Sequence, residues 1–232
     1  MKKFIISICM LAFIGIINAQ NLQLHYDFGE GRQYLTSTVE LFKPDKIGST
    51  FFFIDMDYDL NNAQVKLAYW EIARDFKFKK CPIMFHTEYN GGFGLSAPGV
   101  GYGINSAFLN GLSYSWNNKD FSKGITFIAA HKFITQKDKA SFQLTAVWYL
   151  KFWKNRLYFT GFADFWKEKN DFFTNADPGT VTKFVFLSEP QLWYNVTKKF
   201  AVGTEIEIAS NFALHKGLKV CPTIGVKYVF ND

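Results

Sequence analysis

Residues 218–230 read L-K-V-C-P-T-I-G-V-K-Y-V-F, and this stretch decides the fold. Side chains of a β-strand alternate between two faces, so residues two apart lie on the same side. At that period the larger apolar side chains share one face, and the lysine, cysteine, threonine and glycine residues fall on the other. The pattern predicts a strand with one apolar face and one small or polar face.

The end of this strand carries a second signal. Gly225 is followed by Tyr228 and Phe230, and the sequence ends two residues later. This glycine-x-x-aromatic-x-aromatic ending resembles the closing strand of bacterial outer-membrane β-barrels. The resemblance implies that a barrel-insertion machinery recognises Gly225, Tyr228 and Phe230.

The composition agrees with alternation along the whole chain. Aromatic residues make up 19% of the 232 residues, with 27 Phe and 11 Tyr, yet charged residues reach 20% and the mean hydropathy is −0.05. A helical membrane protein would show apolar runs of about 20 residues, and none occurs beyond the N-terminal region. A transmembrane barrel shows one strand face to lipid and the other to a wet interior. We therefore predict an all-β protein, a closed antiparallel transmembrane β-barrel of about twelve strands.

Charge and cysteine usage exclude other classes. The formal net charge is +6, but the basic residues are scattered in short connections such as Lys79-Lys80 and Lys198-Lys199, so we expect no nucleic-acid partner. Cys81 and Cys221 are expected near opposite rims of the barrel, too far apart for a disulfide.

The N-terminal residues have the features of a secretory leader. A basic start, an apolar run over residues 4–17 and a small residue at Ala19 are typical of a signal peptide. We expect cleavage after Ala19, so that residues 1–19 are removed and residues 20–232 form the barrel. The expected location is the outer membrane of a Gram-negative bacterium.

Twelve alternating segments follow the leader. Their expected ranges are 22–28, 35–42, 50–58, 65–73, 82–90, 106–116, 125–133, 141–151, 157–166, 182–194, 200–210 and 218–230. An even number of strands places both ends on one side of the membrane. The connections that follow odd strands include two long predicted loops: residues 91–103, expected to fold over the pore mouth, and residues 167–181, expected to be a lid or a solvated tip.

Several segments resemble a known family. The run T-V-E-L-F-K-P-D-K-I-G-S-T-F-F-F-I-D-M-D-Y-D at residues 38–59 resembles the second and third strands of the Tsx-like nucleoside channels, as do residues 70–78, residues 161–166 and the last strand. The similarity is to a sister branch of that family. It extends over most of the mature chain, but only residues 38–59 form a specific motif. It implies a monomeric twelve-stranded barrel with a narrow pore for nucleosides. No nucleoside-contacting residue of that family is matched to a position here.

Strand parity supplies candidate lumen residues. A charged side chain facing lipid costs about 2–4 kcal/mol at mid-membrane for a cation and less for an acid, so charged residues are expected to point inward or to lie at the rims. The strongest candidates are the pairs Asp55 with Asp57 and Glu205 with Glu207. The full set proposed to contact solute is Asp55, Asp57, Glu71, His86, Glu88, Tyr149, Asp164, Glu189, Gln191, Glu205, Glu207 and Lys227. Strand alternation also predicts an inward position for four further residues: Gln23, His25, Asp27 and Gln143.

Two alternatives to a channel stay open. The inward residues could pair with interior Lys, Arg and Tyr and fill a plugged barrel with a structural or surface-recognition role. Some barrel enzymes hydrolyse lipid with a histidine two residues before a serine on the lipid-facing wall, but none of the four histidines here has that spacing. His86 and Glu88 have no third ligand at a spacing that supports zinc, so no metal or cofactor is expected. We predict a non-enzymatic channel for small polar solutes, with nucleosides favoured.

Overall fold

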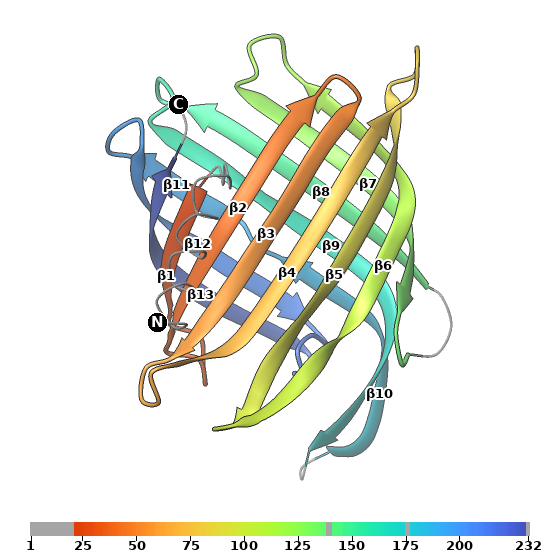
Figure 1. Ribbon diagram of the computed structural model, residues 1–232, viewed down its shortest axis with the longest axis vertical. Coiled ribbons are helices and arrows are strands. Elements are labelled where there is room, and N and C mark those ends of the chain that lie inside the picture. The colour runs from red at the N-terminus through yellow and green to blue at the C-terminus, as the bar shows by residue number, and fades with distance from the viewer. Residues whose placement is uncertain (1–20, 138–140, 175–176, 231–232) are drawn as a thin grey trace, which may run out of the picture.

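The computed structural model describes residues 21–137, 141–174 and 177–230; the side chains of residues 171–180 lie outside this description. One sheet of thirteen strand segments makes up the molecule (Figure 1). The segments are β1 (Asn21–Asp27), β2 (Leu35–Asp45), β3 (Gly48–Asp59), β4 (Gln64–Lys77), β5 (Ile83–Ala97), β6 (Val100–Asn117), β7 (Lys123–Ile134), β8 (Ser141–Phe152), β9 (Leu157–Thr174), β10 (Asp177–Ser188), β11 (Gln191–Asn195), β12 (Phe200–Ser210) and β13 (Leu218–Val229).

The sheet closes on itself with twelve strands, because β10 and β11 are two parts of one strand. Both pair with β9 on one side and with β12 on the other, without a shift in register. Pro190 has no backbone N–H to donate and so interrupts the ladder between them. The backbone carbonyl of Pro190 still accepts from the N–H of Ile206 at 3.0 Å. Antiparallel pairing of β1 with β13 completes the predicted closed barrel.

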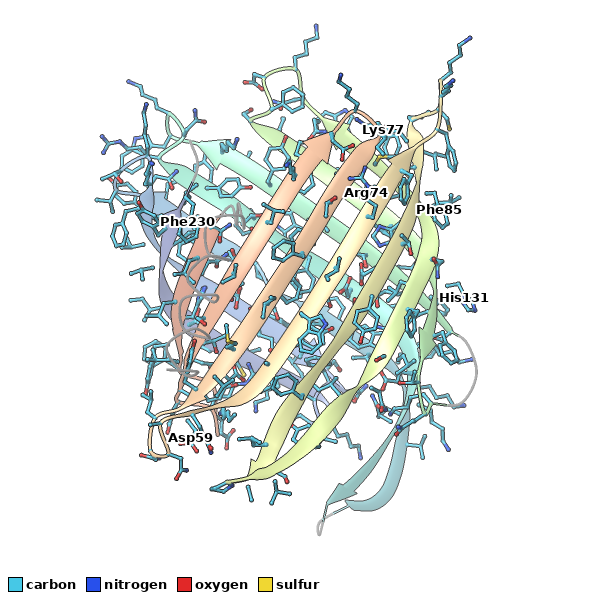
Figure 2. The ribbon with its side chains drawn as sticks, in the orientation of Figure 1. Asp59, Arg74, Lys77, Phe85, His131 and Phe230 are labelled. Carbon is cyan, nitrogen blue, oxygen red and sulfur yellow. The ribbon has the colours of Figure 1, made fainter. Side chains whose placement is uncertain are left out.

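The burial pattern is inverted relative to that of a soluble protein. Along β13, Val220 and Ile224 are 49% and 61% exposed, whereas Cys221 and Lys227 are 0% and 7% exposed. The apolar side chains therefore cover the outer wall, and the polar ones face a common interior. Phe85 and Phe230 project from the outside of the barrel in Figure 2. This is the arrangement expected of a barrel surrounded by hydrocarbon.

The two rims of the barrel differ. The start of β1 and the end of β13 lie at one rim, called here the terminal rim, together with connections 46–47, 78–82, 118–122, 153–156 and 196–199. It is at the top of Figure 1. Opposite it, at the far rim, the hairpins β5–β6 and β9–β10 extend beyond the other strands (Figure 1).

These hairpins correct the two predicted long loops. Residues 91–103 are not a loop over the mouth, because β5 and β6 continue through them and only residues 98–99 connect the strands. Residues 167–174 and 177–181 likewise extend β9 and β10. The glycines that suggested a loop are accommodated within the strands: a Cβ on Gly94 would lie 2.5 Å from the Tyr102 ring, which occupies that space.

Other expectations concern the leader and the cysteines. The predicted signal peptide, residues 1–19, lies outside the described residues. Within the described part of the chain, no helix is long and apolar enough to cross a membrane. Cys81 is exposed in the connection between β4 and β5, and Cys221 is buried in β13; the two are not bonded to each other.

Candidate functional site

Six carboxylates surround the middle of the barrel interior and are called here the central acidic band: Asp55, Glu71, Glu88, Asp164, Glu189 and Glu205. They come from β3, β4, β5, β9, the Pro190 break and β12, so the band reaches around the wall. Each is only partly buried. Several of their hydrogen-bond donors are neutral: Thr38 donates to Asp55 at 2.5 Å, Tyr69 to Glu71 at 2.7 Å and Gln191 to Glu205 at 2.5 Å. These three carboxylates are thus bound by neutral groups, whereas Glu88 contacts His86.

Aromatic rings alternate with these acids on β3 and β4. Phe53 is paired with Glu71 and Asp55 with Tyr69, so the four inward side chains form a checkerboard of rings and carboxylates. The centroids of the Phe53 and Tyr69 rings are 6.0 Å apart, within the range of favourable ring contacts. A planar or ring-shaped solute could contact a ring and a carboxylate here at the same time.

A buried lysine lies over a tryptophan between this band and the terminal rim. The Lys227 ammonium is 4.0 Å from the centroid of the Trp193 ring, and Trp193 is fully buried. A cation over an aromatic face gains about 2 kcal/mol or more when desolvated, which offsets part of the cost of burial. The Trp193 ring also meets His25 edge to face at 5.4 Å and donates Nε1–H to Gln191 at 2.8 Å. This cluster ties β1, β11 and β13 together where the barrel closes.

A second lysine and tryptophan pair lies on the opposite wall. Lys132 Nζ is 4.1 Å from the Trp166 ring centroid and donates to Gln143 Oε1 at 2.6 Å. Gln143 donates to Thr145 at 3.1 Å, and the Thr145 hydroxyl donates to Asp164. The network therefore connects the cation to one carboxylate of the central acidic band through two neutral side chains.

His86 is held between two acids. Its Nδ1 lies 3.0 Å from Asp75 Oδ1 and its Nε2 lies 3.1 Å from Glu88 Oε2. The Ser113 hydroxyl donates to the same Asp75 oxygen at 2.6 Å. The serine is thus bonded to the acid and not to the histidine, which differs from the order of contacts in a Ser-His-Asp triad.

The connection between β1 and β2 reaches into the far rim. Arg32 donates to Asp27 at 3.0 Å and to Glu207 at 2.6 Å, so one guanidinium is shared between two inward carboxylates. Tyr34 bonds to Asp57 and carries the Lys66 ammonium 3.2 Å above its ring. Burial, and then the nearby Asp57 carboxylate, raise the pKa of the Tyr34 phenol above its ordinary value, so the hydroxyl remains a neutral donor.

The structure places the predicted site residues at three heights. Asp55, Glu71, Glu88, Asp164, Glu189 and Glu205 form the central acidic band, and His86 and Gln191 bond to members of it. Lys227 lies toward the terminal rim. Asp57 and Glu207 lie toward the far rim with Tyr34 and Arg32. Tyr149 is apart from the rest, bonded to Asn117 at 2.8 Å near the terminal rim.

Sequence reasoning missed several participants. Trp193 and Trp166 share the parity of Gln191 and Asp164, so their strand positions contained the signal. Lys132 shares the inward parity of its strand in the same way. The inward position of Arg32 could not be predicted in this way, because side chains alternate between the two faces only within a strand and Arg32 lies in a connection.

The side chains that could bind a metal are dispersed over the inner wall. Among the described residues, no three or more His, Cys, Asp or Glu side chains are grouped closely enough to hold a metal ion. The acids of the interior are spread over the wall instead of converging on one point.

Comparisons with known proteins agree with the architecture. The family model described as "Domain of unknown function (DUF5020)" matches residues 19–230. No curated protein matches the sequence. Of the solved structures, the NanC porin has a TM-score of 0.58 at 8% identity, covering 90% of this chain and 98% of that chain. Outer membrane phospholipase A from Escherichia coli has a TM-score of 0.51 at 11% identity, covering 93% and 97%. The KdgM porin has a TM-score of 0.48 at 12% identity, covering 91% and 98%.

At these identities the likeness concerns the fold alone. The matched structures include a porin and a phospholipase, and the same barrel therefore serves both transport and catalysis. The resemblance to Tsx-like channels is not confirmed by these matches. The matches therefore do not indicate the function of this chain.

Proposed function

This chain belongs to the DUF5020 family, and we propose that it is an outer-membrane channel through which small polar solutes diffuse passively. The observation that carries the proposal is the closed barrel with an apolar outer wall and partly accessible carboxylates inside. Val147, which shares the inward parity of Thr145, is 40% exposed, so water reaches the inner wall beside β8. Weak contacts along such a wall would lower the desolvation cost of a solute without trapping it.

The proposed location follows from the leader. Cleavage after Ala19 would leave residues 20–232 as the barrel, with the terminal rim in the periplasm. N-terminal sequencing of protein from purified outer membranes should begin at Gln20. Recovery of the uncut chain in the inner-membrane fraction would contradict this assignment.

Nucleosides are the favoured solute. The checkerboard of Phe53, Tyr69, Asp55 and Glu71 offers rings for a base and carboxylates for ribose hydroxyls. Stacking on an aromatic ring is worth about 1–3 kcal/mol per base, and a hydrogen bond to a charged group contributes about 1.5–3 kcal/mol. The resemblance of residues 38–59 to Tsx-like channels points to the same solute.

Swelling of proteoliposomes tests this proposal. Nucleosides should enter faster than sugars of similar size, and Asp55→Ala and Glu205→Ala should each slow nucleoside entry. Asp120→Ala is the matched control, because Asp120 is an exposed acid in the connection between β6 and β7. Unchanged nucleoside entry in both lumen variants would show that the residue assignments are wrong.

A closed barrel with a structural role is the second candidate. Trp193, His86 and Gln23 are almost fully buried inside the barrel, so part of the interior is packed with side chains. Absence of swelling with every solute, in protein shown to be folded, would favour this candidate over the channel. In either case a single barrel is the proposed functional unit, and light scattering in detergent should give the mass of one chain.

We also propose that the protein is not an enzyme. His131 projects from the outer wall (Figure 2), where a lipid hydrolase would need its base. Its strand neighbours are Asn110 and Phe142, and the Thr87 hydroxyl donates to Asn110 at 2.9 Å, away from His131. Purified protein should release no fatty acid from phospholipid vesicles. Release that disappears in His131→Ala would contradict this.

A further inference from the structure

Asn90 carries a buried acceptor with no partner. The residue is 4% exposed, and its Oδ1 makes no hydrogen bond. Asn90 lies directly opposite Glu71 in the pairing of β4 with β5, and it follows Glu88 by two residues, so all three side chains share the inward face. Buried polar atoms are normally bonded. This oxygen therefore faces a place where a donor is expected.

Acidic side chains outnumber basic ones around this oxygen. Glu71 lies within electrostatic range of Glu88 and Asp164, and Lys132 is the cation that acts on it most strongly. Asp75 joins through His86, which contacts Asp75 and Glu88. Four acidic side chains, Glu71, Glu88, Asp164 and Asp75, therefore face two basic ones, Lys132 and His86.

Further acidic side chains lie beside this group in the interior. Glu189 lies within electrostatic range of Glu205, Glu207 and Asp55, and also of Glu71. Two groups of acids are thus adjacent across the lumen. Since the acids of the described residues are too dispersed to form a metal site, a ligand with separated charges matches them better than a bare ion.

We propose that Asn90, Glu71, Glu88 and Asp164 form a lumen site for an extended organic cation with two or more ammonium groups, a linear polyamine in chemical class. An ammonium donates three hydrogen bonds and accepts none, which matches a site built from carboxylate and amide oxygens. A second ammonium of the same molecule reaches the group around Glu189 and Glu205. The inference rests on the proposed open lumen and adds a cationic ligand to the nucleosides proposed above.

Isothermal titration calorimetry of the full chain in detergent, with spermidine as the probe, tests the site. Saturable binding is expected. Glu71→Gln and Asn90→Leu should each weaken binding about tenfold or more, as expected for lost bonds to a charged group. Asn90→Asp should tighten binding, a gain that a merely structural role of Asn90 would not produce. Glu30→Gln is the matched control, since it removes one exposed carboxylate outside the barrel interior.

Three results would overturn the inference: no binding by the folded chain, equal weakening by Glu30→Gln, or displacement of spermidine by Mg²⁺ at equal charge concentration. Circular dichroism establishes that each variant is folded, and Asp164→Asn replaces Glu71→Gln if that variant fails to fold. Calorimetry requires no conduction. If liposomes swell with neutral solutes but the protein does not bind spermidine, only the polyamine site is refuted. If the protein binds spermidine but no solute enters the liposomes, only the channel is refuted.

Discussion

Two lysines inside the barrel are stabilised by the faces of tryptophans. Lys227 over Trp193 and Lys132 over Trp166 place each ammonium about 4 Å from a ring centroid. A lysine buried without a partner would lose its proton or destabilise the fold. The ring, the nearby acids and, for Lys132, the amide oxygen of Gln143 together allow the charge to remain inside. These tryptophans therefore support the electrostatics of the lumen as well as its packing.

Replacing Trp193 tests this role. Trp193→Ala removes a fully buried ring that contacts Lys227 and His25, and large-to-small changes of this kind cost about 3–5 kcal/mol. The free energy of unfolding in detergent, measured by guanidinium titration, should fall by that amount. Trp153→Ala is the control, because Trp153 is exposed in the connection between β8 and β9 and should change it little. Equal effects of the two changes would contradict the packing described for β11.

At the scale of elements, the interrupted strand β10–β11 restricts which residue the neighbouring strand can carry beside the break. Pro190 breaks the ladder, and the neighbouring β9 approaches it closely at Gly161. A Cβ on Gly161 would lie 2.6 Å from the carbonyl oxygen of Glu189 and 2.8 Å from Cα of Pro190. Backbone atoms cannot turn aside as a side chain can, so this position requires glycine.

Gly161→Ala should therefore lower the free energy of unfolding by about 1–3 kcal/mol, the usual cost of overpacking. Gly103→Ala is the matched control, because nothing lies within 4 Å of a Cβ at that strand glycine. Guanidinium titration in detergent measures both. A loss in Gly103→Ala as large as in Gly161→Ala would show that glycine loss in general, and not the contact with Pro190, is responsible.

The last strand supplies a second prediction at this scale. Tyr228 and Phe230 lie on the outer wall with ring centroids 5.5 Å apart, and we propose that the barrel-insertion machinery recognises them. Phe230→Ala should reduce the amount of assembled barrel in the outer membrane severalfold, measured by immunoblotting of unheated membrane samples. Phe200→Ala removes a lipid-facing phenylalanine from the neighbouring strand and should have little effect. If both variants reduced the amount of assembled barrel equally, contact with lipid, and not recognition of the C-terminal residues, would explain the loss.

The strands could be predicted from the sequence because period-two alternation is strong in this chain, and β12 has the predicted bounds. The predictions failed where the local signal conflicted with pairing across strands. Glycines at residues 91–103 favour turns locally, but the partner strand and rings such as Tyr102 keep them in β5 and β6. Parity predicted an inward face for Asp55 and Glu205 and left the face of Glu71 ambiguous. It did not predict their common height, which depends on register and strand tilt.

At the scale of the whole molecule, the chain has an excess of basic residues, whereas the middle of its interior is lined by acidic ones. The net charge is +6, yet the middle of the lumen carries the central acidic band. Many basic residues lie in exposed connections of the terminal rim, such as Lys79, Lys80, Lys198 and Lys199. Exposed charges are screened beyond about 8 Å at physiological salt, whereas charges inside a narrow barrel are screened less. The interior should therefore decide which ions pass.

The reversal potential of single barrels in a planar bilayer under a KCl gradient tests this account most directly. We predict discrete conductance steps, with a reversal potential whose sign shows that K⁺ passes more readily than Cl⁻. The reversal potential should be smaller in Glu205→Gln, which removes one carboxylate of the central acidic band. Folded protein that gives no steps, or steps selective for Cl⁻, would contradict a water-filled acidic lumen.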